Sequence, residues 1–210
     1  MKARRTIIAL GLAVAAPAVA FAQSPRDELR DAMDKLWTQH VEWTRMFIVS
    51  AVAGTPDKDA ITTRLLQNQT DIGNAIAPYY GASAGTQLTS LLKTHILQAA
   101  DLVAAAKANN TAAVDSLNKK WHANAVDISN FLSKANPKHW PEATVQSLMF
   151  THLDQTVNEA THQIKGDYAA SIKDYDMIET HILKLADALS SGIVAQFPEK
   201  FRGMKAKSKP

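Results

Sequence analysis

Histidine is the residue type whose placement in this chain points most directly to chemistry. Four histidines each stand within an otherwise apolar stretch, and the segment Thr-His-Ile-Leu at 94–97 recurs at 180–183. Neutral imidazole is a ligand for zinc, copper(II), iron and manganese. A buried imidazole without a partner costs on the order of 1–3 kcal/mol, so each ring needs a hydrogen-bond partner or a ligand. The four residues are His40, His95, His152 and His181.

Asparagine and aspartate accompany the histidines in a second recurring motif. The pattern Asn-x-x-Asp-Ile-x-Asn occurs at 68–74 and at 124–130, and a Thr-His pair follows each copy at nearly the same distance. The carboxylates are further metal ligands, or acceptors that orient imidazole rings. We therefore expect a ligand-binding set in which two tryptophans could wall a pocket beside the polar groups. Its members are Asn68, Asp71, Asn124, Asp127, Trp43 and Trp121.

Six helical segments must position these residues. No stretch shows the two-residue alternation of a strand, and the breaks between periodic segments are short. Short turns place successive helices antiparallel, so the sequence predicts an all-α fold, a six-helix antiparallel up-and-down bundle. Capping residues, glycine and proline mark the segment ends, and Pro78 is expected to end the second helix. The expected helices cover about 25–52, 56–78, 83–109, 111–136, 141–166 and 167–197.

The polar residues of the predicted bundle share one height. In an antiparallel hairpin, residues equidistant from the turn lie at the same level, with a rise of about 1.5 Å per residue. This spacing brings each of the four histidines to within about 6 Å, along the bundle axis, of a polar residue on a neighbouring helix. We expect one polar layer to which all six helices contribute. The hairpins of the second and third helices and of the fourth and fifth resemble each other, which predicts an internal pseudo-repeat.

The layer has three interpretations. It could hold a divalent transition metal or haem through the histidines, or a small organic ligand in an apolar pocket, in a binding protein. It could be a hydrogen-bonded layer that only fixes helix register, in a structural or interaction protein. A layer histidine acting as a base, in a hydrolase or transferase of undefined substrate, comes third. We favour the binding protein, because the polar residues coincide in both height and inward direction.

The first 22 residues are predicted to be an export signal. Lys2, Arg4 and Arg5 precede an apolar run, and Ala-Phe-Ala at 20–22 has the small residues of a cleavage site. The run is shorter than the roughly 20 residues of a spanning helix, so we expect no transmembrane helix after cleavage. Export predicts a periplasmic or secreted protein. The expected segments are a signal peptide at 1–22, one bundle domain at 23–197 and a basic, disordered tail at 198–210.

Composition and charge exclude several functional classes. The chain has 210 residues, of which 46% are hydrophobic, typical of a folded globular protein. Three of its 23 basic residues lie in the signal, which leaves 20 against 20 acidic residues and no nucleic-acid footprint. The absence of cysteine excludes disulfides, thiolate metal sites and covalent c-type haem.

A di-iron site is disfavoured, and other charged residues are expected at the surface. Glu159-x-x-His162 has the spacing of di-iron carboxylate bundles but has no second copy. His162 is expected at the surface or a helix end. Arg45 and Arg64, one to two turns from the layer, are expected in surface salt bridges.

Several segments together resemble a family of bacterial helical-bundle proteins of unknown function. The resemblance covers nearly all of the predicted bundle and implies the same helical fold. Some members carry the labels glycosyltransferase or acetylglutamate kinase, but this chain has no nucleotide-binding loop and no α/β alternation. The resemblance therefore implies a fold and no mechanism. It rests on His40-x-x-Trp43-Thr44-Arg45, 64–74, Tyr79-Tyr80-Gly81, the Thr-His-Ile segments and Gln196-Phe197-Pro198.

Overall fold

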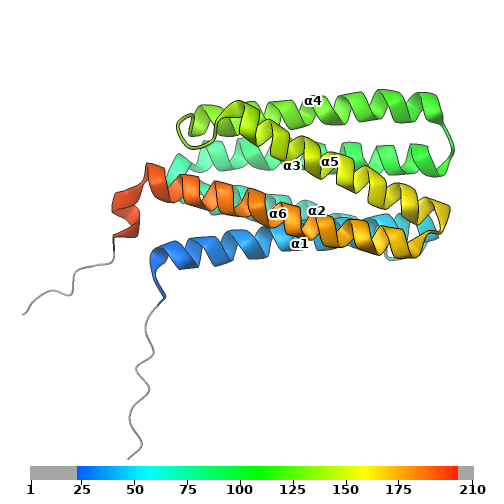
Figure 1. Ribbon diagram of the computed structural model, residues 1–210, viewed down its shortest axis with the longest axis horizontal. Helices are drawn as coiled ribbons and strands as arrows, with labels where there is room; N and C mark the ends of the chain where they lie inside the picture. The colour runs from blue at the N-terminus through cyan, green and yellow to red at the C-terminus, as the bar shows by residue number, and fades with distance from the viewer. Residues whose placement is uncertain (1–22, 203–210) are drawn as a thin grey trace, which may run out of the picture.

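The computed structural model describes residues 23–202, and its regular secondary structure in this range is entirely helical. The predicted all-α fold is confirmed: six α-helices follow one another through short connections (Figure 1). A 3₁₀ turn, η1, follows the last helix. The bounds are Pro25–Ala53 (α1), Lys58–Tyr80 (α2), Ala82–Lys107 (α3), Thr111–Ala135 (α4), Glu142–Lys165 (α5), Tyr168–Gln196 (α6) and Pro198–Phe201 (η1).

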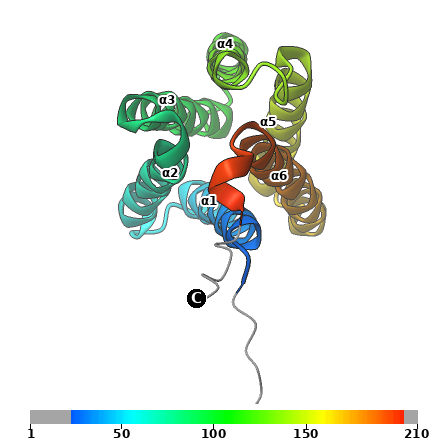
Figure 2. The same cartoon turned by 90° about the vertical axis from the view of Figure 1, so that its left-hand side faces the viewer.

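The helices form a closed ring of antiparallel neighbours. Each helix packs against the next one along the chain, and α6 returns to pack against α1 (Figure 1 and Figure 2). The odd-numbered helices α1, α3 and α5 also contact one another across the middle of the bundle. These three helices run in the same direction, so residues at one height on them can meet at the bundle axis.

Local sequence sets several helix ends as expected. Ser24 caps α1 by accepting a hydrogen bond from the Asp27 amide at 3.3 Å. Pro25 takes the first helical position, where a missing N–H costs nothing. Helices α1 and α5 end at Gly54 and Gly166, whose φ angles of 73° and 77° lie in the left-handed region that glycine adopts readily.

The second helix does not end at Pro78, contrary to the prediction. Helix α2 continues through Pro78 to Tyr80. The Tyr80 hydroxyl donates to Gln196 Oε1 at 2.7 Å, and the Tyr79 ring stacks on Phe201. These contacts hold the last turn of α2 in place, and they outweigh the local preference of proline for ending a helix.

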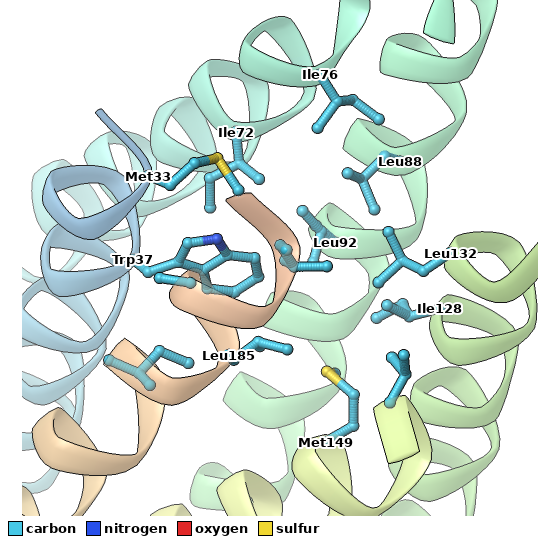
Figure 3. Packing of buried hydrophobic residues seen from close by; sticks show 14 of the residues in the cluster. Met33, Trp37, Ile72, Ile76, Leu88, Leu92, Ile128, Leu132, Met149 and Leu185 are labelled. Carbon is cyan, nitrogen blue, oxygen red and sulfur yellow. The ribbon is translucent and has the colours of Figure 1, made fainter. Parts of the chain in front are cut away.

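The hydrophobic core contains two clusters. The larger one includes Trp37 and Met149 (Figure 3), and most of its residues lie in the half of the bundle where α1 begins and α6 ends. Its central packing leaves a space of only about 10 Å³. The smaller cluster includes Phe47 and Leu65 and lies toward the turns that join α1 to α2, α3 to α4 and α5 to α6. The predicted polar layer falls between these two halves.

The connection from α4 to α5 is docked onto α6. Trp140 is buried there and donates its indole N–H to the Ala188 carbonyl at 3.1 Å. Asn136 donates to the carbonyl of Gly192 at 2.9 Å. A β-carbon added to Gly192 would lie 2.0 Å from Nε1 of Trp140, so this position has no room for a side chain.

The fold extends past the domain end expected at residue 197. Pro198–Phe201 forms η1, and Phe201 is 6% exposed and stacks on Tyr79 with the ring centroids 5.6 Å apart. Lys200 donates to the Pro78 carbonyl at 2.8 Å. The first residues of the expected tail are therefore packed against α2. Residues 203–210 and the predicted signal peptide at 1–22 lie outside the described residues.

Candidate functional site

Six buried polar side chains, one from each helix, lie at the middle of the bundle. Each of these residues is at most 8% exposed. The rings of His40 and His152 lie 5.5 Å apart between centroids, and those of His95 and His152 lie 6.3 Å apart. The inner helices α1, α3 and α5 thus bring three histidines together. The six residues, called the histidine layer below, are His40, Asn68, His95, Asn124, His152 and His181.

One hydrogen bond recurs in three hairpins of the bundle. In each hairpin, the layer residue of the even-numbered helix donates to a backbone carbonyl four residues before the histidine of the preceding helix. This hydrogen bond makes the hairpins α1–α2, α3–α4 and α5–α6 similar to one another. The sequence motif instead makes the hairpin α2–α3 similar to α4–α5. The internal repeat that the motif predicts stays a prediction. The bonds run from Asn68 to Leu36 at 3.0 Å, from Asn124 to Leu91 at 3.2 Å and from His181 to Leu148 at 2.8 Å.

The bond between His95 and Asn124 fixes one imidazole tautomer. Nδ1 of His95 lies 2.9 Å from Oδ1 of Asn124. The Asn124 amide nitrogen already donates to Leu91, so its oxygen must accept and His95 Nδ1 must carry the proton. His95 Nε2 is therefore left with a lone pair while the ring is neutral.

A glutamine that the sequence analysis did not select completes the layer beside His40. Gln69 is fully buried, and its amide nitrogen donates to the Leu65 carbonyl at 2.9 Å and to Asn68 Oδ1 at 3.0 Å. The same nitrogen lies 3.3 Å from Nδ1 of His40. Gln69 directly follows Asn68 along the chain. The recurring motif includes Asn68 and not Gln69, so the motif did not select Gln69. A second amide side chain directly after Asn68 was nevertheless a signal that could have indicated it.

The three inner histidines are held in their neutral form by burial. Burial lowers the pKa of His40 to about 3 and that of His95 to about 4. Burial, reinforced by the neighbouring histidines, lowers the pKa of His152 well below its ordinary value. Within residues 23–202, His152 Nδ1 is buried without a hydrogen-bond partner. These three inner histidines are thus uncharged near neutral pH, and His152 is the layer member with a buried, unpartnered ring nitrogen.

Four residues of the expected ligand-binding set lie outside the layer, and of these only Trp121 is buried. Asp71 has a 35% exposed side chain and faces Arg64 at 3.7 Å. Asp127 is exposed, and Trp43 is half-buried beneath the Arg64 guanidinium. Each aspartate follows a layer asparagine by three residues, which turns its side chain about 60° away from the inward direction. Neither aspartate orients an imidazole ring.

A cavity of about 80 Å³ lies one helical turn beyond the layer, toward the turns that join α3 to α4 and α5 to α6. Thr44, Ala99 and Thr156 line it, and each follows a layer histidine by four residues. Trp121 also lines the cavity, and its ring packs against His95 with the centroids 5.0 Å apart. The histidine layer and the cavity are therefore adjacent parts of one region.

A second buried polar cluster lies where α1, α5 and α6 meet. Arg45 Nη1 lies 2.6 Å from Glu159 Oε1 and 3.2 Å from the Ser171 hydroxyl. Glu159 is 1% exposed, and burial raises its pKa to about 7 although the Arg45 charge opposes this shift. The expected surface salt bridge of Arg45 is thus a largely buried one. Glu159 follows His152 by seven residues, or two turns, a spacing that indicates the same inward face.

The geometry of the described residues does not converge on a metal. Within residues 23–202, no group of three or more histidine, aspartate or glutamate side chains is placed to hold a metal ion. None of the helices in this range is long and apolar enough to cross a membrane. Comparison with protein-family models, curated proteins and solved structures finds no match to this chain. The family resemblance rests on the quoted residues alone.

Proposed function

We propose that this protein is an exported helical-bundle binding protein that holds a small molecule in the cavity beside the histidine layer. The supporting observation is the position of the cavity, since Thr44, Ala99 and Thr156 each lie one turn beyond a layer histidine. An apolar cavity beside a few oriented polar groups is the usual form of a small-molecule site. Export rests on the predicted signal peptide at 1–22, with the periplasm or the medium as its destination.

The size of the cavity limits the ligand. A buried apolar cavity of about 150 Å³ takes up benzene or xenon, and a single water needs only about 10–15 Å³. At about 80 Å³, this cavity lies between those cases and far below the range of about 300–1,000 Å³ for drug-sized ligands. The ligand is therefore compact. A small organic molecule fits better than haem, which is larger than a drug-sized ligand.

The runner-up is a structural or interaction protein whose histidine layer only fixes helix register. The hydrogen bond that recurs in three hairpins supports it, because each bond ties a side chain to one carbonyl of the partner helix. A slip of one residue would leave both groups buried and unpaired. The two functions differ in their use of the cavity, since a register device needs no space beside it.

Binding of xenon, a single atom, to the mature protein tests the proposal. We expect xenon to perturb the resonances of Thr44 and Thr156 in the unmodified protein. The variant Ala99→Leu places extra methyl groups in the cavity and should weaken binding by at least about tenfold, which corresponds to about 1.4 kcal/mol. Ala104→Leu, an exposed position on the same helix, is the matched control. Equal binding by the two variants, or no binding to the unmodified protein, would exclude the cavity as the site.

A further inference from the structure

We propose that the ligand of this cavity is an uncharged molecule that carries a hydrogen-bond acceptor, and that Trp121 donates its indole N–H to it. This inference rests on the proposed function and names the chemical class of the ligand. It depends on three features: the absence of charge in the cavity wall, the lack of a hydrogen-bond partner for the Trp121 N–H, and the hydrogen bonds already made by the buried threonines of the wall.

Among residues 23–202, no charged side chain lines the cavity. An ion placed there would lose its hydration without gaining a counter-charge, which is strongly unfavourable. Arg45 and the buried Glu159 are paired with each other at 2.6 Å and do not line the cavity. A neutral ligand is therefore the class that the wall accepts.

Trp121 supplies the wall with an unused donor. The residue is 2% exposed, and within residues 23–202 its Nε1 is buried without a hydrogen-bond partner. Its ring packs against that of His95, with the centroids 5.0 Å apart, and also lines the cavity. Buried indole N–H groups usually find an acceptor, because leaving one unpaired is unfavourable. An acceptor on a cavity ligand would satisfy this group.

The buried threonines of the wall do not compete as donors. The Thr44 hydroxyl donates to the His40 carbonyl at 2.7 Å, and the Thr156 hydroxyl donates to the His152 carbonyl at 2.8 Å. Each hydroxyl oxygen retains only acceptor capacity. Thr161, the third threonine of the wall, is half-buried toward the solvent side. Trp121 is thus the buried donor that gives the site its polarity.

Two probes of matched shape separate this inference from the proposed function. Cyclobutanone and methylenecyclobutane each have five heavy atoms. Cyclobutanone carries an oxygen acceptor where methylenecyclobutane carries an apolar methylene group. Both should bind the unmodified mature protein. Trp121→Phe keeps an aromatic ring and removes the donor, so it should weaken cyclobutanone binding about tenfold more than methylenecyclobutane binding.

The outcomes of this experiment are distinct. Equal losses for both probes would overturn the role of Trp121 and leave the proposed function standing, whereas no binding of either probe would overturn both. If Trp121→Phe does not fold, the unmodified protein gives the answer through the indole N–H resonance of Trp121. That resonance should move downfield with cyclobutanone and not with methylenecyclobutane. Identical shifts with the two probes would contradict the inference.

Discussion

His95 Nδ1 and Asn124 Oδ1 lie 2.9 Å apart across the interface of α3 and α4, and both residues are buried. Asn124 is itself oriented by the Leu91 carbonyl, so the pair has one favourable arrangement. A buried donor that loses its acceptor costs more than the hydrogen bond contributed, whereas removal of both partners costs less. This asymmetry makes the pair suitable for a direct test.

Asn124→Leu should destabilise the protein by about 1–3 kcal/mol, because it leaves the His95 N–H buried without an acceptor. The double variant His95→Leu/Asn124→Leu should lose less than the sum of the two single losses. Urea unfolding of the four proteins measures the coupling. Strictly additive losses would show that the two side chains do not interact in solution.

Acid should destabilise the fold through the inner histidines. Burial places the pKa of His40 at about 3 and that of His95 at about 4, both below the ordinary value of 6.5. The unfolded chain therefore binds more protons between these values and pH 6.5. Stability is fully present above pH 6.5 and falls below it, by about 2 kcal/mol per histidine at pH 5. Thermal unfolding from pH 7.5 to 5 measures this loss.

A double variant identifies the histidines responsible for that slope. His40→Leu/His95→Leu should flatten the dependence on pH, because it removes two groups whose pKa is lowered by burial. Glu159 has a raised pKa and contributes a slope of the opposite sign, since its stability contribution is lost as pH rises toward 7. A slope that survives in the double variant would assign the acid sensitivity to other groups.

Substitution of Arg45 should destabilise the protein to an extent that depends on pH. Arg45→Met leaves a carboxylate in a site that is 1% exposed, and we expect a loss of about 3 kcal/mol at pH 8. The loss should shrink at pH 5, where Glu159 takes up a proton and becomes neutral. Lys173→Met, an exposed position on α6, controls for the removal of one positive charge. Chemical denaturation at the two pH values makes the comparison, and a loss independent of pH would contradict a charged Glu159.

Gly192→Ala should destabilise the docking of the α4–α5 connection on α6. The new β-carbon would lie 2.0 Å from Trp140 Nε1, so the indole must move and lose its bond to Ala188. Such overpacking costs about 1–3 kcal/mol. Ser191→Ala, at an exposed neighbouring position, should change little. The measurement is the melting temperature of each variant. Equal melting temperatures for Gly192→Ala and Ser191→Ala would show that the Trp140 indole moves aside without loss of stability.

Much of the fold follows from the sequence, because helix ends and inward faces obey local rules. The height of His95 relative to Asn124 could be predicted by measuring along the helices from their common turn. Pro78 and Phe201 could not be placed in this way. Contacts made by Tyr79 and Tyr80 with residues more than a hundred positions later decide both. Such contacts leave no periodic signal in the chain.

The candidate site was less predictable than the fold. The histidines could be selected because each interrupts an apolar stripe, but a recurring motif made Asp71 and Asp127 look equivalent to their asparagine neighbours. The direction of a side chain changes by about 100° per residue, so a residue can share the motif and miss the core. The burial of Glu159 was missed because the di-iron motif that contains it has no second copy. Its spacing of seven residues from His152 nevertheless indicated the same inward face.

The histidine layer divides the core into two halves. We therefore expect the two ends of the bundle to differ in how often they open locally. The half around Trp37 and Met149 is closely packed, whereas the half beyond the layer contains the cavity. Native-state hydrogen exchange should therefore be faster in the last turns of α3 and α5 than in their first turns. An occupied cavity would slow hydrogen exchange mainly at that far end. Ligand binding would therefore reduce the frequency of local opening there without changing the shape of the molecule.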